Sequence, residues 1–216
     1  MKKLFSVAGI FLLVCILTGC TRTKIQYWEN GNKKSEMAYR NGKLQGVATW
    51  YYQDGKKHYE VIYKDDLLEG KATRWYSNGK VQSEDYYSGN MLNGSSIDWG
   101  IDGSMIEMRT YRNDTLHGPF RRSYANRQLQ IEGTYNNGLY DGKWLYWDTY
   151  GNIVGEGNYK DGAGIQKGWG PDGKLIRKIS YKDNRKHGKE IIYNSEGDVV
   201  KEIIYEYGEV VDVNEF

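Results

Sequence analysis

The sequence predicts an all-β protein, an elongated antiparallel meander of about eight tandem β-hairpin repeats. Two observations predict this fold. The chain repeats itself every 24 residues, with one interval of 22, and self-similarity at a fixed period of this size indicates small units stacked on one another. Each unit also carries two turn signals, and strands joined by short turns can pair only as antiparallel neighbours. We therefore expect one single-layered sheet of about sixteen strands.

The unit is clearest in the stretch RWYSNGKVQSEDYY, residues 74–87. A strand ends at an aromatic residue, a turn follows around an Asn-Gly pair, and a second strand carries a tyrosine eight residues after the glycine. The turn position is occupied by Gly31, Gly55, Gly79, Gly103, Arg127, Gly151, Gly173 and Gly197. The tyrosine is present in every copy, as Tyr39, Tyr63, Tyr87, Tyr111, Tyr135, Tyr159, Tyr181 and Tyr205. The aromatic residue, four positions before the turn glycine, is Tyr27, Tyr51, Trp75, Trp99, Trp147, Trp169 or Tyr193, and only Ser123 departs from the pattern.

A second turn is expected eleven residues after the first glycine, where every copy has Gly, Asp or Asn, the residues that most readily accept a positive φ. A further glycine follows at Gly46, Gly70, Gly94, Gly118, Gly142, Gly164 and Gly188. Each unit therefore predicts a strand, a tight turn, a strand and a wider turn. The two-residue deletion before Gly173 should tighten one wider turn, and Arg127 predicts a changed turn or a changed curl in the fifth copy.

The type of the first turn decides which residues share a face of the sheet. A two-residue loop would place the repeated aromatic opposite the third residue after the glycine, on the face of the repeated glutamates. A three-residue loop with a bulge would pair it with the second residue. That residue is apolar in six copies, and Pro171-Asp172-Gly173 fits the longer loop. We therefore expect Trp75, Val81 and Tyr87 on one face and the glutamates on the other.

Residues 1–19 are expected to be a signal peptide, because Lys2 and Lys3 precede an uncharged apolar run that ends in small residues. Leu17-Thr18-Gly19-Cys20 resembles the bacterial lipobox, which implies cleavage before Cys20 and a lipid on its sulfur. The lipidated cysteine and a short tether should occupy residues 20–26, the repeats residues 27–210, and a C-terminal tail, either a last edge or frayed, residues 211–216.

Cleavage would remove Cys15 and leave the mature chain without a disulfide or a thiol metal site. It would also remove Lys2 and Lys3 and no acidic residue, so the 30 basic and 28 acidic residues of the full chain become equal in number. A chain without net positive charge has no field to attract nucleic acid. We expect no cofactor, and the oligomeric state is left open.

The repeated glutamates are the obvious candidates for acid–base chemistry, and they include Glu36, Glu60, Glu84, Glu132, Glu156 and Glu202. Equivalent residues of adjacent copies should lie two strands apart, about 9.5 Å, which is wrong or marginal for a glycosidase pair. The histidines fall in copies too far apart to converge on a metal. We therefore expect no enzyme and no metal site, and a solvated ladder of glutamates instead. Met108 and Lys178 replace glutamate in two copies.

Aromatic residues outside the repeat pattern could form a binding face beside the glutamates, because tryptophan next to a carboxylate suits a glycan or the basic residues of a protein. Surface cover remains the alternative. The candidate binding face contains Trp50, Tyr52, Tyr76, Trp144, Tyr146, Glu60, Glu84, Glu132 and Glu156.

The pattern, as in GKATRWYSNGKVQSEDYYSGN and GKWLYWDTYGNIVGEGNYKDG, resembles the bacterial variant of the MORN repeat found in YwqK-family antitoxins. The resemblance covers nearly all of the mature chain and implies stacked β-hairpins that act as interaction or scaffold modules. The lipobox implies export, and this chain therefore differs from the cytoplasmic antitoxins of that family. We therefore expect a non-catalytic, lipid-anchored envelope protein whose sheet binds a protein or an envelope glycan, or alternatively an envelope immunity protein that neutralises a toxin. Thr21 after Cys20 favours the outer membrane where the organism has one, and otherwise the outer face of the cytoplasmic membrane.

Overall fold

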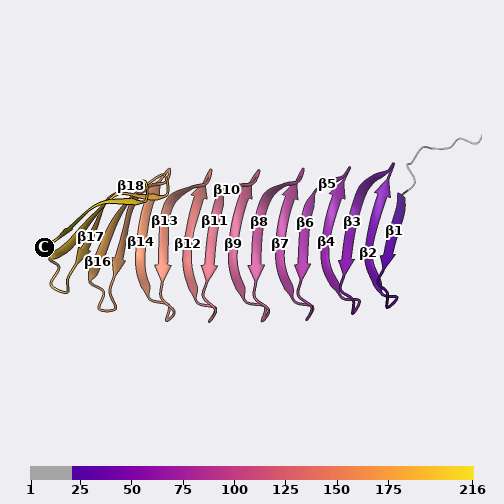
Figure 1. Cartoon of the computed structure of the whole chain (residues 1–216), viewed down its shortest axis with the longest axis horizontal. Coiled ribbons are helices and arrows are strands. Elements are labelled where there is room, and N and C mark those ends of the chain that lie inside the picture. Colours follow the sequence, from indigo (N-terminus) through magenta and orange to yellow (C-terminus); the bar gives the residue numbers. More distant parts are fainter. Residues whose placement is uncertain (1–20) are drawn as a thin grey trace, which may run out of the picture.

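A computed structural model describes residues 21–216 of the chain, and the expected signal peptide and Cys20 lie outside this range. The described residues form one open antiparallel sheet of 19 strands without a helix, which confirms the predicted fold (Figure 1). The strands that lead into the first turns are β1 (Thr21–Tyr27), β3 (Lys43–Tyr51), β5 (Leu67–Leu68) with β6 (Gly70–Trp75), β8 (Met91–Trp99), β10 (Thr115–Leu116) with β11 (Gly118–Ser123), β13 (Leu139–Trp147), β15 (Ala163–Trp169) and β17 (Arg185–Tyr193). The strands that leave them are β2 (Lys33–Arg40), β4 (Lys57–Lys64), β7 (Val81–Ser88), β9 (Met105–Arg112), β12 (Leu129–Asn136), β14 (Ile153–Lys160), β16 (Leu175–Lys182) and β18 (Val199–Glu206), and β19 (Glu209–Glu215) completes the sheet.

The count exceeds sixteen because two strands are interrupted and one strand is added. β5 and β6 are separated only by Glu69, and β10 and β11 only by His117. Residues 211–215 belong to β19, so the last edge, and not a frayed tail, is the correct alternative. Residues 21–26, where we expected a tether, belong to β1.

The first turns are the three-residue loops that the sequence predicts. In the third copy the Gly79 N–H donates to the Tyr76 carbonyl at 2.9 Å, and the Tyr76 N–H donates to the Lys80 carbonyl at 2.9 Å. All eight copies repeat these two hydrogen bonds, including the fifth. Arg127 takes the place of the glycine there with a φ of 73°. The turn of the fifth copy is therefore unchanged, and our expectation of a different turn was wrong.

The second turns are tighter than we expected. Each is a two-residue loop in which both residues have positive φ, as in Asn41 (52°) and Gly42 (83°), the pattern of a type I′ hairpin. The following glycine belongs to a β-bulge: Met37 pairs with Ala48 and Tyr39 with Leu44, so three residues of one strand lie opposite one residue of the other. These glycines have positive φ at Gly46, Gly70, Gly94, Gly118, Gly142 and Gly188.

The deletion in the seventh copy removes this bulge and leaves the turn intact. β14 pairs with β15 without interruption from Lys160–Ala163 to Gly155–Gly168. Our expectation that the deletion tightens a turn was therefore wrong. Figure 1 shows strands β1 to β14 standing side by side, whereas β16 to β19 are turned relative to them. The change of direction starts where the bulge is missing, as expected when a device that bends and twists a strand is removed.

The two faces of the sheet differ from our expectation because of a second bulge just after each first turn. Trp75 pairs with Val81, as expected, but Arg74 pairs with Ser83, so Gln82 is an extra residue. The extra residue exchanges the faces. The Lys57 ammonium contacts both the Trp75 ring, at 5.5 Å from its centroid, and the Glu60 carboxylate. Trp75 therefore lies with the glutamates, and we call this side the glutamate face; Tyr87 lies on the opposite side, the tyrosine face.

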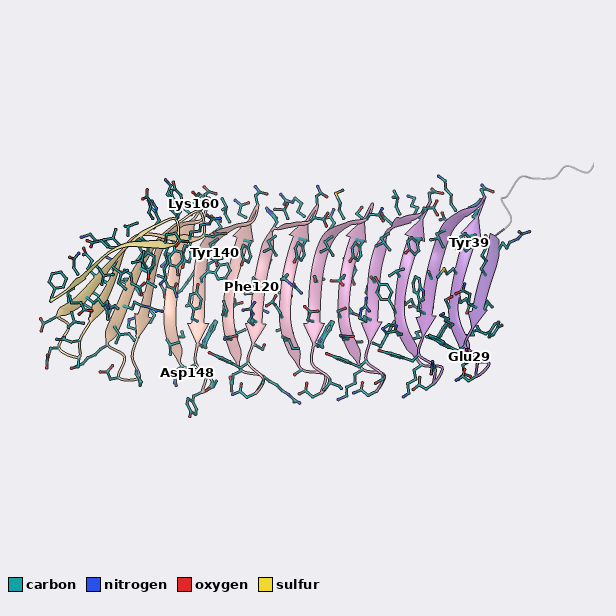
Figure 2. The ribbon with its side chains drawn as sticks, viewed as in Figure 1. Glu29, Tyr39, Phe120, Tyr140, Asp148 and Lys160 are labelled. Carbon is teal, nitrogen blue, oxygen red and sulfur yellow. The ribbon has the colours of Figure 1, made fainter. Side chains whose placement is uncertain are left out.

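The tyrosine face holds two clusters of buried residues. The first, in the N-terminal half, consists of Ala48, Val61 and Ala72 with the surrounding aromatic side chains. The second consists of Phe120, Trp144 and Tyr159 with their neighbours. Figure 2 shows Phe120 and Tyr140 over the middle of the ribbon, Asp148 at the edge of the first turns and Lys160 at the edge of the second turns.

Candidate binding surface

A single row of side chains crosses the glutamate face from one end of the sheet to the other. Paired positions follow one another across successive strands, for example Glu60 with Thr73 and Thr73 with Glu84. The repeated glutamates therefore alternate with residues of the intervening strands. Each glutamate of the row contacts a cation on the same face, in the pairs Glu36–Lys33, Glu60–Lys57, Glu84–Lys71, Glu132–Arg121, Glu156–Lys143 and Glu202–Lys189.

Each of these six glutamates is thus neutralised by a neighbouring cation. Hydrogen bonds from Lys143 and Asn158 lower the pKa of Glu156, so this carboxyl group is held in its ionised form. A catalytic acid needs the opposite shift, toward a protonated carboxyl group at neutral pH. The arrangement is that of a solvated ladder of ion pairs, which agrees with the structural interpretation of the glutamates.

The ladder is interrupted in the fourth copy. Met108 takes the glutamate position and pairs with Ile97, where the second and third copies have a threonine and a glutamate. Trp99 and Met105, paired with each other, lie beside them. The four side chains are partly exposed, and we call them the apolar patch: Ile97, Trp99, Met105 and Met108.

Charged residues border the apolar patch on both sides along the row. Glu84 pairs with Ile97 on one side and bonds Lys71. Arg121 pairs with Met108 on the other side and bonds Glu132. A shallow pocket between copies is lined by Val81, Glu84 and Trp99, among others. The patch is thus an apolar centre inside a charged rim.

Three of the expected binding residues lie on the tyrosine face, so our placement of Trp50, Trp144 and Tyr146 beside the glutamates was wrong. Trp50 packs against the first buried cluster, with its ring 5.6 Å from that of Tyr59. Trp144 is 2% exposed and belongs to the second cluster, against which Tyr146 packs. Burial raises the pKa of Tyr146 to about 12. The extra residue after each first turn, which exchanges the faces, is the reason for the error.

Tyr52 and Tyr76 connect neighbouring copies. The Tyr52 hydroxyl donates to the Trp75 carbonyl at 2.6 Å, and the Tyr76 hydroxyl donates to the Trp99 carbonyl at 2.8 Å. Trp28 and Tyr124 make the corresponding bonds in their copies. This ladder of side chain to backbone bonds ties each first turn to the next copy, so the two tyrosines have a structural role.

The sequence does carry a signal for the interior that we did not use. Large residues on one strand face small residues on the next: Phe120 pairs with Gly133, and Trp144 with Gly157. A Cβ atom on Gly133 would lie 2.1 Å from the Trp144 ring. The first copies show the reverse order, with Ala48 facing Val61. Because a large side chain on one strand is paired with a small residue on the next, the sequence indicates that side chains pack closely on the tyrosine face.

The histidines do not form a metal site. His58 stacks on Tyr52, with ring centroids 4.5 Å apart, and burial together with Arg74 lowers its pKa. His117 and His187 each accept a hydrogen bond from a backbone N–H near the following second turn. Within residues 21–216 no group of three or more His, Cys, Asp or Glu side chains could hold a metal ion.

The comparison with protein families agrees with this architecture. The MORN repeat variant matches residues 44–65, 68–88 and 164–183, and each matched segment contains one first-turn hairpin. These three segments of the chain are similar to MORN repeats. Outside the matched segments, the other hairpins of the sheet have the same first-turn bonds and the same second-turn geometry. A search of curated proteins found no match. Within residues 21–216, no helix is long and apolar enough to cross a membrane.

Proposed function

We propose that this MORN-repeat protein is a non-catalytic, lipid-anchored envelope protein that binds a protein partner through the apolar patch. MORN repeats often serve as binding or scaffold modules. The lipobox-like Leu17-Thr18-Gly19-Cys20 supports both the lipid anchor and the location in the cell envelope. The lipid on Cys20 holds the sheet at the membrane surface, on the outer membrane where one exists.

The observation that carries the proposal is the break in the ion-pair ladder. In a repeat protein the expected residue at each position is known from the other copies, and Met108 takes a position that six of the eight copies fill with glutamate. Ile97 is aliphatic, as are Ile25, Leu145 and Ile191 at the equivalent position, but those three residues pair with a glutamate, whereas Ile97 pairs with Met108. The methionine in place of a glutamate therefore concentrates apolar surface at one place. Methionine and tryptophan are enriched in the centres of protein interfaces, which are typically surrounded by a polar rim. The charged neighbours of the patch supply this rim.

Chemistry favours a protein partner over a glycan at this place. A glycan offers many hydroxyl groups and is bound by polar side chains next to an aromatic ring, whereas Met108 and Ile97 offer no polar atom. Methionine also adapts its shape to irregular apolar surfaces. A protein that inserts apolar side chains between the two charged borders fits the patch best.

The test changes the fourth copy into a regular one. The double variant Ile97→Thr, Met108→Glu restores the pair found in the second and third copies, so the sheet should fold. The matched control, Thr49→Ile with Glu60→Met, makes the reverse change in the second copy. Each protein carries a photo-reactive amino acid at Met105 and is cross-linked in the envelope of living cells.

The proposal expects wild type and control to give the same cross-linked partner and the regularised variant to lose it. Equal cross-linking by all three proteins would contradict a binding role of the patch. The anchor is tested separately, by metabolic labelling with a fatty-acid probe in the presence and absence of Cys20→Ala. Loss of the label in the variant is the expected result, and retained label would contradict lipidation at that residue.

The alternative role as an immunity protein would use the same surface. The partner would then be a toxin that acts in the envelope, and the lipid anchor would place the inhibitor in its path. A toxin gene beside the gene of this protein, together with killing of cells that carry the regularised variant, would favour this role. Survival of those cells would contradict it.

A further inference from the structure

The sheet is open, and its two outermost strands are both unpaired on one side. β1 pairs only with β2, and β19 pairs only with β18, among the strands of residues 21–216. Every residue of both strands is exposed. A free edge presents a row of N–H and C=O groups that can pair with another chain.

The two edges carry opposite charges. β1 has two basic residues, Arg22 and Lys24, and no acidic one. β19 has three acidic residues, Glu209, Asp212 and Glu215, and no basic one. Charged side chains on an edge normally prevent association. Here the charges oppose pairing of β1 with β1 and of β19 with β19, and they favour pairing of β1 with β19.

We propose that β1 of one copy pairs with β19 of a second copy, so that the protein assembles head to tail into a longer sheet. The inference rests on the two edges and does not depend on the lipid anchor or on the apolar patch. The contact is heterologous, since each copy contributes a different edge. Heterologous contacts that do not close into a ring give open chains of copies.

The direction of the strands decides how the copies meet. Sixteen successive antiparallel pairings separate β1 from β19, so the two strands point the same way within one chain. A neighbour turned over about the long axis of the sheet would present an antiparallel edge, which pairs slightly more stably than a parallel one.

The turned-over arrangement also matches the side chains. In β1, Lys24 lies on the tyrosine face, paired with Met37, and Ile25 lies on the glutamate face, paired with Glu36. In β19, Asp212 and Val213 lie on opposite faces, paired with Ile204 and Ile203. Turning one copy over brings Lys24 and Asp212 to one side.

The same rotation brings apolar side chains together on the other side. With Lys24 opposite Asp212, Thr23 lies opposite Val213, and Ile25 approaches Val210 across the bulge at Val211. Val210 and Val213 are about half exposed in a single copy, at 54% and 46%. Cross-strand pairs of this kind, apolar or of opposite charge, stabilise a sheet.

The test reverses the charge of one edge at a time in the full-length chain. A photo-reactive amino acid at Thr23 is activated in living cells, and cross-linked species are separated by size. Wild type should give dimers and larger species, and their cross-linked peptides should join β1 to β19. Arg22→Glu with Lys24→Glu, or Glu209→Lys with Asp212→Lys, should each reduce these species about tenfold or more, since about 1.4 kcal/mol corresponds to a factor of ten.

Combining the four substitutions restores the opposite charges of the edges and should restore the larger species. This rescue excludes misfolding as the cause of the loss. Cross-links between two β1 strands, an absence of cross-linked species in wild type, or a loss that the combined variant does not rescue would each overturn the proposal.

Discussion

Glycine positions on the tyrosine face show how single residues hold a sheet that is one layer thick. Trp144 lies over the backbone of Gly133, where a Cβ atom would be 2.1 Å from the ring, and it donates a hydrogen bond to the Thr134 carbonyl at 3.1 Å. Because residues 21–216 form no second layer over this face, large side chains are buried by their neighbours in the same layer. The small residue beneath the ring is therefore as necessary as the ring.

Gly133→Ala should lower the free energy of unfolding by about 1–3 kcal/mol, because the ring must move from a packed position. Gly168→Ala is the matched control, since Gly168 does not have positive φ and the nearest atoms to a Cβ there are at 3.7 Å. Alanine at this site should be neutral or stabilise by up to about 1 kcal/mol. Chemical denaturation measures both, and equal effects of the two substitutions would contradict the packing of Trp144.

Glu190 is a buried carboxylate that should make stability depend on pH. It is 4% exposed, and its oxygens lie 2.7 Å from the Lys186 ammonium and 3.7 Å from Arg177. Burial alone would raise its pKa, but hydrogen bonds from Lys186 and Tyr205 outweigh burial and lower the pKa below the ordinary 4.5. A lowered pKa gives stability that is present above 4.5 and is lost as the pH falls through the folded-state value.

Glu190→Gln should therefore cost about 1.5–3 kcal/mol of unfolding free energy at neutral pH, and the difference from wild type should shrink as the pH falls below 4.5. Glu156→Gln serves as the comparison, because its exposed pair with Lys143 should contribute about 1 kcal/mol or less. Urea denaturation between neutral pH and pH 3 measures the difference. A cost for Glu190→Gln that stays the same at acid pH would show that charge is not its cause.

At the scale of the hairpin, the three-residue type of the first turn was predictable, and the bulge that follows it was not. The pairing of Trp75 with Val81 followed from the apolar character of Val81 and from Pro171 in an equivalent loop. The extra residue Gln82 has no such mark, because a polar residue fits either a strand or a bulge. One extra residue exchanges the faces of a sheet. The binding candidates Trp50 and Trp144 were therefore assigned to the wrong face, although the turns were right.

The second turns are linked to one another by side chains, and the link changes where the bulge is missing. Asn90 accepts a hydrogen bond from the Leu68 N–H, 22 residues away. Asn184 instead reaches across Gly162 to bond the Tyr140 N–H at 2.7 Å and the Gly138 carbonyl at 2.8 Å, 44 and 46 residues away. The Asn184 side chain thus joins two second turns, and its backbone N–H donates to the Gly162 carbonyl of the turn between them, which contracts this edge of the sheet where the strands change direction.

Asn184→Ala should be more destabilising than Asn90→Ala by about 1 kcal/mol, because it removes one more hydrogen bond. Both residues have positive φ, 61° and 71°, so the backbone cost of alanine is similar in the two variants. Thermal denaturation gives the comparison. If the two substitutions were equally destabilising, the contracted edge would not depend on Asn184.

At the scale of the whole molecule, the two buried clusters are separated by a polar stretch of the tyrosine face. Asp85 bonds Ser96, and Arg109 lies between Asp98 and Glu107. The packed regions are therefore local, as in other repeat proteins in which each unit contacts mainly its neighbours. The length of the molecule follows from the number of strands and not from the size of a core.

Small-angle X-ray scattering of residues 21–216 carrying Arg22→Glu and Lys24→Glu, to keep the copies separate, tests the central claim that the hairpins form one extended sheet. Seventeen continuous strands at about 4.8 Å each extend over about 80 Å, for which we expect a radius of gyration of roughly 25 Å. A compact globule of this size would give about 17 Å. A value near 25 Å is the predicted result, and a value near 17 Å would contradict the single-layered sheet on which the binding surface depends.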